Sequence, residues 1–430
     1  MWWLYQAALG AALLAVAPWL LARRGRHYLP TLRGRRVRDA AAPPGAPGTL
    51  WIHAVSVGEA AVASALAHRL PSDLPLLVTT ITPTGQARAR SGVAALAPRA
   101  TVAYLPFDLG PPVERFLSRY APAALVLVEG DYWPLLLARV RRRGLPVAVI
   151  NGRLSDRSFP RLLRIRPLVR KLLLDPVDRF GVQTETDRER LEALGVGADR
   201  ISVTGNLKFD FPEPPELPEL AARMKQWADG RPLLVAGSTM PGEEEAVLAA
   251  FALAGGPERA LLVVAPRHPD RFGDAWELAR GRFPGSLRRS AGGGNRPAVV
   301  LLDSIGELAA LYRYAAAAFV GGTLAPTGGH NPIEPARFGV PVAVGPSMEN
   351  FREIAERFDA AAAWSRVRDS ADLGALWLRL LGAPEEARAL GARGRELVDA
   401  GRGATERTLE LLAPLVGAVR DRRRAGGSAT

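Results

Sequence analysis

The sequence of 430 residues contains no cysteine, and only three of its 56 basic residues are lysine. Without cysteine the chain can form neither a disulfide framework nor a thiolate metal site, and it is compatible with a reducing compartment. Acidic residues number 43, so the net charge is +13. A basic surface favours anionic partners, which are nucleic acid, acidic lipid headgroups or a phosphorylated substrate.

Charge is also missing from the first 22 residues of the chain. An uncharged apolar segment of ~20 residues is about long enough to span the hydrocarbon core of a bilayer. Seven arginines follow by residue 38, and this asymmetry predicts that the rest of the chain stays on the cytoplasmic side. We therefore expect a membrane-anchor helix over residues 1–22 and a basic linker over residues 23–48.

Two alternatives to a spanning helix fit the same segment. A cleaved signal peptide fits less well, because no basic stretch precedes the apolar run. A helix that lies in the bilayer interface is the second alternative, because Pro18 and several alanines make the segment only moderately hydrophobic.

From residue 49 to residue 210, apolar runs of strand length alternate with helix-like segments. Strands of a parallel sheet that is covered on both faces have nearly continuous apolar sequences. We therefore predict one doubly wound α/β domain over residues 49–210. Its expected strands are Leu50–Val55, Leu76–Ile81, Val102–Pro106, Ala124–Val128, Val147–Ile150 and Phe180–Gln183.

The alternation is interrupted over residues 211–231, where FPEPPELPEL has the composition of a linker. It then restarts, which predicts a second Rossmann-like domain over residues 232–404, followed by a helix over 405–420 and a basic tail over 421–430. Its expected strands are Leu233–Ala236, Ala260–Ala265, Ala298–Leu302, Ala316–Val320 and Val342–Val344. Because such sheets bind ligands at the carboxyl ends of their strands, we expect the two domains to face each other across a cleft that holds the site.

The stretch Gly321–Phe351 combines several features of a nucleotide-phosphate site. Four glycines, at positions 321, 322, 328 and 329, follow a predicted buried strand and allow backbone to approach a ligand. Asn331 suits a helix N-cap, Pro332 the first helical position, and Glu334 stands three residues after the cap. We therefore predict that a helix N-terminus points at this loop and that a phosphate binds there.

Carboxylates follow two of the predicted strands in the first domain. Glu59 opens the helix after the first strand, where a first-turn glutamate is favoured by the helix dipole and a general base is also plausible. Glu129 and Asp131 flank a glycine at the end of the fourth strand. This acidic pair suits either a metal site or the cap of the helix that begins near Pro134.

Cationic residues and glycine turns supply the other candidate groups. Lys208 lies in a glycine-asparagine turn at the end of the first domain, and the scarcity of lysine suggests that its compact ammonium group is required there. Arg267 ends the second strand of the second domain, where it could bind a nucleotide phosphate. The loop Gly237–Glu244 has N–H groups that could hold a phosphate, and Asn151–Ser155 is expected to line the cleft.

The order of strand, glycine-rich loop, Gly-His-Asn-Pro-x-Glu-Pro, short helix and strand resembles the donor site of GT-B glycosyltransferases, which have two Rossmann-like domains. It is most similar to the 3-deoxy-D-manno-octulosonic acid (Kdo) transferases of lipopolysaccharide synthesis. The His-x-x-Ser-x-Gly-Glu segment at 53–59 and the Gly-Asn-x-Lys-Phe-Asp segment at 205–210 resemble the same family. The resemblance extends from Trp51 to about Phe351.

The resemblance implies an inverting enzyme that moves Kdo from CMP-Kdo to a lipid A precursor, lipid IVA, without a metal or cofactor. It implies that Glu59 is the general base and that Lys208 and the acidic pair stabilise the transition state. The family usually has Glu-x-Glu-x-Trp-Pro at the position of the acidic pair. Because the second acid is an aspartate here, the resemblance assigns the role more securely to Glu129 than to Asp131. The implied CMP-binding positions are Pro266, Arg267, Ile305, Gly306, Glu307, Asn331, Pro332, Ile333 and Glu334.

The same resemblance implies the surroundings of the protein. The expected partners are the CMP-Kdo donor, the lipid A precursor and anionic lipids of the inner membrane, at whose cytoplasmic face the single anchor would hold the enzyme. In this fold the helix over residues 405–420 would cross back onto the first domain.

Two other functions remain open at this point. Another GT-B sugar-nucleotide enzyme, such as a UDP-sugar transferase or a UDP-N-acetylglucosamine 2-epimerase, would share the fold and the glycine-rich donor site. The motif at His53–Glu59 argues against such a UDP-sugar enzyme. A membrane-tethered nucleic-acid binder would explain the charge, but the sequence lacks an interleaved aromatic and basic motif, so no nucleic acid is expected.

Overall fold

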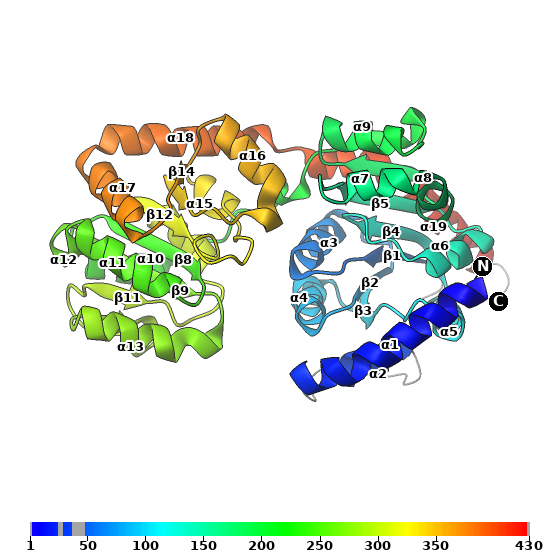
Figure 1. The fold of residues 1–430 in the computed structure, drawn as a ribbon, viewed down its shortest axis with the longest axis horizontal. Helices are drawn as coiled ribbons and strands as arrows, with labels where there is room; N and C mark the ends of the chain where they lie inside the picture. The colour runs from blue at the N-terminus through cyan, green and yellow to red at the C-terminus, as the bar shows by residue number, and fades with distance from the viewer. Residues whose placement is uncertain (1, 25–28, 37–47, 428–430) are drawn as a thin grey trace. The chain divides into compact units, whose positions relative to one another are not determined.

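The computed structural model describes residues 2–24, 29–36 and 48–427. The chain divides into two compact units, Met1–Phe211 with Arg402–Thr430, and Pro212–Gly401. Each unit contains a sheet of seven strands that pair in parallel (Figure 1). Helices cover both faces of each sheet, so the prediction of two doubly wound, Rossmann-like α/β domains is confirmed.

The first sheet has the strand order β3-β2-β1-β4-β5-β6-β7. Its strands are β1 (Thr49–His53), β2 (Leu76–Thr80), β3 (Ala100–Tyr104), β4 (Pro122–Val128), β5 (Val147–Gly152), β6 (Arg179–Val182) and β7 (Ile201–Val203). The helices of this unit are α1 (Trp2–Arg24), α2 (Leu29–Arg36), α3 (Val57–Arg69), α4 (Pro83–Val93), α5 (Gly110–Tyr120), α6 (Pro134–Arg142), α7 (Phe159–Arg164), α8 (Arg166–Val169), α9 (Glu185–Ala193) and α19 (Ala404–Gly427).

Alternate residues of the first sheet's strands pack on opposite faces. Leu50 and Ile52 of β1 pack with residues of α3, α4 and α19, whereas Trp51 packs with residues of α5 and α6 on the other face. Both layers are fully buried, and each buried aliphatic or aromatic side chain contributes about 1.5–3 kcal/mol. This burial on both faces explains why the strands have continuous apolar sequences.

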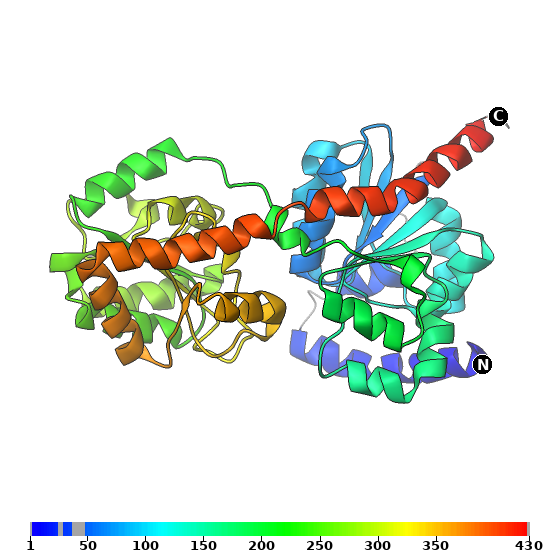
Figure 2. The same cartoon turned by 90° about the horizontal axis from the view of Figure 1, so that it is seen from above.

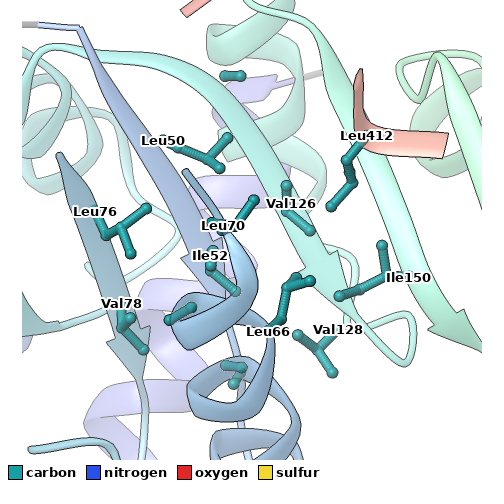
Figure 3. Packing of buried hydrophobic residues seen from close by; sticks show 14 of the residues in the cluster. Leu50, Ile52, Leu66, Leu70, Leu76, Val78, Val126, Val128, Ile150 and Leu412 are labelled. Atoms are coloured by element: carbon teal, nitrogen blue, oxygen red, sulfur yellow. The ribbon is translucent and has the colours of Figure 1, made fainter. Parts of the chain in front are cut away.

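The C-terminal helix α19 completes the core of the first unit. Leu412 of this helix lies beside Val126 and Ile150 of neighbouring strands (Figure 3), and the helix lies along the sheet (Figure 2). Asp210 fixes its start, because its carboxylate accepts hydrogen bonds from the N–H groups of Gly403 (2.8 Å) and Thr405. The last element of the chain therefore belongs to the same unit as the first strands.

The second sheet has the strand order β10-β11-β9-β8-β12-β13-β14. Its strands are β8 (Leu233–Thr239), β9 (Leu261–Pro266), β10 (Leu287–Arg288), β11 (Val299–Leu301), β12 (Ala317–Val320), β13 (Val342–Val344) and β14 (Ser365–Arg366). Its helices are α10 (Pro218–Ala228), α11 (Glu243–Leu253), α12 (Gly256–Arg259), α13 (Phe272–Arg282), α14 (Leu308–Leu311), α15 (Ile333–Ala336), α16 (Arg352–Ala360), α17 (Ser370–Gly382) and α18 (Pro384–Ala400).

Helices form within two segments that were expected to be linkers. Within residues 211–231, helix α10 buries Leu220, Met224 and Trp227 in the second core at helical spacing. Within residues 23–48, helix α2 forms, and the carbonyl of Arg35 accepts the N–H of Phe107. The parts of this second segment at 25–28 and 37–47, and residues 428–430 of the expected basic tail, lie outside the described residues.

The N-terminal segment forms helix α1, but no helix among the described residues is both long enough and apolar enough to cross a membrane. The predicted membrane anchor is therefore not supported. Polar side chains of α1 contact the first unit instead. Tyr5 donates its hydroxyl to Asp108 (2.6 Å), and the side-chain oxygen of Gln6 accepts from the N–H of Gly110 (2.8 Å).

Candidate active site

Most of the predicted site residues follow strands at the carboxyl ends of the two sheets, around the points where the strand order reverses. In the first sheet the order reverses between β1 and β4, and in the second between β8 and β12. Open α/β sheets bind ligands outside such points. We call the two groups of loops the first edge and the second edge. The first edge comprises Val55–Glu59, Glu129–Trp133, Asn151–Arg153 and Asn206–Lys208, and the second edge comprises Gly237–Glu243, Pro266–His268 and Gly321–Glu334.

Glu59 lies in the first turn of α3, directly after β1. Its N–H donates to Ser56 Oγ (3.2 Å), and its carboxylate accepts from the N–H groups of Ser56 (3.2 Å) and Val55 (2.8 Å). These reciprocal bonds form a capping box, so the residue also shapes its own loop. Each carboxylate oxygen retains a lone pair that can accept a proton.

The surroundings of Glu59 make its carboxylate a stronger base. Burial raises the pKa of Glu59 above its usual value, the N–H of Val55 acts in the opposite direction, and the negative charges of Glu129 and Asp131 raise it further. A general base works best when its pKa approaches the operating pH. Because β1 and β4 are paired neighbours in the sheet, the loops that carry Glu59, Glu129 and Asp131 lie at the same end of adjacent strands.

Glu129, after β4, is the centre of an ion-pair network. Its carboxylate accepts from Lys208 Nζ (3.0 Å) and from Arg153 Nε (3.1 Å), and the side-chain amide of Asn151 donates to it at 3.4 Å. Burial opposes ionisation of Glu129, but the charges of Lys208 and Arg153 hold its pKa below the usual value. The network fixes the ammonium group of Lys208 at the first edge.

Asp131 stands two residues further along and is exposed. Protein atoms near the carboxyl group still remove part of its hydration. This partial desolvation, and then the negative charge of Glu129, raise the pKa of Asp131. The two acids of the predicted pair therefore differ, because Glu129 is held ionised by cations and Asp131 is not. Among the described residues, no group of three or more His, Asp or Glu side chains is placed to hold a metal ion.

Three non-glycine residues at the strand ends have left-handed backbone conformations. They are Glu129 (φ 63°), Asn151 (φ 52°) and Ser238 (φ 57°). Such a conformation costs about 1–3 kcal/mol for residues other than glycine, and strained residues of this kind cluster at functional sites. At Glu129 it coincides with the turn that places the carboxylate between the two cations.

Two buried polar atoms beside the first edge have no partner among the described residues, His53 Nε2 and Trp133 Nε1. The other ring nitrogen of His53 lies 3.0 Å from Thr79 Oγ1 and 3.2 Å from the Thr79 carbonyl. Burial lowers the pKa of His53 to about 3, so the ring is neutral. Unpartnered buried polar atoms are rare, and a bound substrate or water can complete their hydrogen bonding.

The glycine-rich loop of the second edge is held by a buried glutamate. The carboxylate of Glu243 accepts from four consecutive N–H groups, residues 322–325, at 2.6 to 3.0 Å, and from the N–H of Met240 at 2.9 Å. A Cβ atom at Gly321 would lie 2.3 Å from the Ser238 carbonyl oxygen, so only glycine fits there. Glu243 therefore occupies the N–H groups of residues 322–325, and the binding of a phosphate at this loop stays a prediction for the groups that Glu243 does not bind.

Arg267 and two histidines lie beside this loop. Burial lowers the pKa of His330 to about 4, and the charges of Arg267 and His268 lower it further, so the three side chains are near one another. Arg267 directly follows Pro266 at the end of β9, and its N–H donates to the Thr239 carbonyl (3.0 Å). Its side chain is exposed, so its guanidinium group can bind an anion.

The other predicted donor positions lie on two short turns. Helix α15 begins at Ile333 with Pro332 at the N-cap, so Asn331 lies one residue before the cap position predicted for it; its side chain accepts from the N–H of Ile333 (3.2 Å) and donates to Glu334 (3.3 Å). Helix α15 has only four residues, so the predicted helix N-terminus amounts to a single turn. In the other turn Glu307 pairs with Arg289 (2.9 Å), and Ile305 is 72% exposed. Pro332 is buried, and Gly306 has a φ of 94°.

The structure adds three residues to those predicted. Arg153 lay in a segment expected to line the cleft, His330 lay in the donor motif and Glu243 in a predicted phosphate loop, but none had been given an individual role. Arg153 directly follows β5, and His330 directly precedes Asn331 in the donor motif. These two positions are the signal that could have identified them. Glu243 is one of three consecutive glutamates, two of which are buried, and the sequence does not show which of them binds the loop.

Comparisons with known proteins show the relatives of this chain. A sequence family described as 3-deoxy-D-manno-octulosonic-acid transferase (kdotransferase) matches residues 29–211. The 3-deoxy-D-manno-octulosonic acid transferase of Bordetella pertussis is 36% identical over 424 residues, which cover 95% of this chain and 97% of that protein.

Solved structures are also similar. The C-terminal CMP-Kdo binding domain of WaaA from Acinetobacter baumannii is 33% identical and covers 42% of this chain and 96% of its own, with a TM-score of 0.40. The UDP-GlcNAc 2-epimerase of Neisseria meningitidis has a TM-score of 0.57 at 13% identity and covers 85% of this chain and 100% of its own. At that identity the second likeness shows the fold alone.

Proposed function

This chain belongs to the 3-deoxy-D-manno-octulosonic acid transferases, a glycosyltransferase family of lipopolysaccharide biosynthesis, and from that premise we propose that it transfers Kdo from CMP-Kdo to lipid IVA with inversion at the sugar. The observation that carries the proposed mechanism is the buried Glu59 carboxylate, whose pKa burial raises and the charge of Glu129 raises further. No metal or cofactor takes part in the proposed transfer.

Glu59 is the proposed general base. A hydroxyl of the acceptor attacks the anomeric carbon of Kdo, its proton passes to the Glu59 carboxylate, and the bond to the CMP phosphate oxygen breaks. The Val55 and Ser56 N–H groups hold the carboxylate in place without blocking its remaining lone pairs. A positioned base of this kind contributes about 10²–10⁴-fold to a rate.

Lys208 and the acidic pair are the proposed electrostatic stabilisers. Kdo is an acid, so its carboxylate and the departing CMP phosphate both bring negative charge. The ammonium group of Lys208 is only 12% exposed and is oriented by Glu129, and a pre-oriented charge in a water-poor site stabilises developing charge strongly. In this proposal Glu129 acts mainly by positioning Lys208, and Asp131 has the weaker role.

The second edge is the proposed donor site. Arg267 offers charge-assisted hydrogen bonds to the CMP phosphate, and His330 lies near enough for its pKa to respond to that charge. The turns at Ile305–Glu307 and Asn331–Glu334 are proposed to contact the rest of the nucleotide, with Pro266 at the end of β9. Because Glu243 holds the glycine-rich loop, the phosphate is bound by side chains rather than by that loop.

The cytoplasmic face of the inner membrane is the proposed location, since the proposed acceptor is a membrane lipid. A direct experiment incubates the purified chain with CMP-Kdo and lipid IVA and measures the mass of the lipid product. An increase by one or more Kdo units supports the proposal. No mass increase under conditions in which the chain binds CMP would contradict it, and protection from heat by UDP but not by CMP would favour a UDP-sugar enzyme.

A further inference from the structure

The segment Arg157–Lys171, which contains α7 and α8 (Figure 1), carries six cations and no acidic residue. We call it the α7–α8 surface. Five of the cations have no hydrogen bond or ion pair through their side chains to any described residue, and all five are exposed: Arg157, Arg161, Arg164, Arg166 and Lys171. The sixth, Arg170, pairs with Asp175 at 3.3 Å. The surface therefore has a strong positive charge that its own unit leaves largely uncompensated.

Large apolar side chains are exposed among these cations. Leu163 is 42% exposed, Ile165 51% and Leu168 50%. The opposite side of the same segment packs into the first core through Phe159, Leu162 and Val169. The three exposed side chains are thus not required to attach the segment to its unit.

The local backbone explains how these apolar residues come to face outward. Helix α7 ends at Arg164, Ile165 leaves the helical conformation (φ −114°, ψ 26°), and Pro167 stands in the first turn of α8. A proline there removes an N–H that would otherwise continue the helix. This interruption separates Leu163, Ile165 and Leu168 from the stripe that faces the core.

We propose that the α7–α8 surface docks on an anionic lipid bilayer, with Leu163, Ile165 and Leu168 inserted at the interface and the surrounding cations against the headgroups. Exposed apolar side chains framed by cations are the composition of segments that bind anionic membranes. A nucleic acid would use the charge but would not favour three exposed aliphatic residues. Charge and apolar exposure together therefore favour a lipid surface.

Docking there would place the first edge close to the bilayer. Arg157 follows Arg153, which binds Glu129, by only four residues. Membrane docking itself does not depend on the transfer reaction, but its use in presenting a lipid hydroxyl to Glu59 rests on the proposed function.

The test measures binding of the full chain to vesicles by co-sedimentation. Vesicles of neutral phosphatidylcholine are compared with vesicles that also contain phosphatidylglycerol, and neither contains an acceptor. The variant R161Q/R164Q/R166Q should lose about 100-fold in affinity for the anionic vesicles, since each cation near such a surface contributes about fivefold. The variant L163S/I165S/L168S, which keeps every charge, should lose at least about tenfold.

A matched control removes three exposed arginines elsewhere, R88Q/R90Q/R282Q, and has the same net charge as the first variant. It should bind anionic vesicles much more tightly than R161Q/R164Q/R166Q. CMP binding of all variants checks that the chain is folded. If both surface variants bind like the wild type, or if the control loses as much as R161Q/R164Q/R166Q, the α7–α8 surface is not the docking site.

A second comparison separates a membrane from a nucleic acid. Binding to a DNA duplex should be weak and should not change in L163S/I165S/L168S. If L163S/I165S/L168S keeps full vesicle affinity while R161Q/R164Q/R166Q loses affinity for DNA and for vesicles equally, the surface is a general polyanion site and the proposal fails. These outcomes are read without any transfer activity, so they are independent of a failure of the proposed function.

Discussion

The two edges hold their glutamate carboxylates in opposite ways. At the first edge, side-chain cations bind Glu129, and its charge reaches Glu59 and raises the pKa of that carboxyl. At the second edge, backbone N–H groups bind Glu243, and the side chains that remain near the loop are the cation Arg267, His268 and the neutral His330.

This difference separates two chemical tasks. A buried carboxylate with a raised pKa, such as Glu59, suits proton abstraction, whereas an arginine beside a rigid loop suits the binding of an anionic nucleotide. Substitutions at the first edge should therefore change the rate of transfer, and substitutions at the second edge should change donor affinity or the stability of the unit.

The largest expected effect is that of Glu59→Gln. The amide oxygen can still accept from the N–H of Ser56, so the capping box is retained while the bond from Val55 and the basic group are lost. The turnover number should fall about 10²–10⁴-fold with CMP affinity unchanged. Steady-state kinetics and calorimetry check this pair of results, and near wild-type turnover would remove Glu59 from the mechanism.

The next effect concerns the stability of the second unit. Glu243→Ala leaves the N–H groups of residues 322–325 without their acceptor, which should cost roughly 3 kcal/mol in the free energy of unfolding and weaken CMP binding. Glu245→Ala is the matched control, because that residue lies in the same turn of α11 and is exposed. Equal denaturation midpoints for the two variants would show that the carboxylate does not hold the loop.

Arg267→Ala tests the donor side of the comparison. Loss of a charge-assisted bond to the phosphate should weaken CMP binding by ~1.5–3 kcal/mol. Arg280→Ala, which removes an exposed arginine of α13, serves as the control. Calorimetric titration with CMP measures both, and unchanged affinity in Arg267→Ala would place that side chain outside the donor site.

The smallest effect is a shift in pH dependence. Glu59 must be ionised to act, and its pKa is raised, so the rate should fall as the pH decreases through that raised pKa. Glu129→Gln removes one of the charges that raise it, which should move this acidic limb of the kcat/KM profile to lower pH. The rate at the plateau will also fall, because Lys208 loses its partner, so the position of the limb is the readout. An unmoved limb would mean that the two carboxylates are not coupled.

The buried apolar strands could be predicted from the sequence, and the two-residue strands could not. The apolar run at Ala124–Val128 predicts β4, but β10 and β14 have two residues each and show no periodicity. Helix α10 was not predicted, because the prolines of FPEPPELPEL, in which the helix begins, indicate a linker. Its three buried residues follow a helical spacing that a search for linker composition does not detect.

The site was predictable as a set of strand ends but not as a set of contacts. Glu129 and Lys208 are 79 positions apart, and only the fold shows that they form an ion pair. The occupation of the glycine-rich loop by Glu243 was also not predictable, because a carboxylate that replaces a phosphate leaves the same glycines in the sequence. The apolar length of residues 1–22 suggested an anchor, whereas Tyr5 and Gln6 use polar contacts to bind the first unit.

The division of labour between the two edges is tested most directly by the transfer rate of Glu59→Gln and Arg267→Ala over a range of CMP-Kdo concentrations. The account predicts that saturating donor restores most of the rate in Arg267→Ala and none of it in Glu59→Gln. Recovery of Glu59→Gln at high donor concentration, with Arg267→Ala remaining slow, would contradict it.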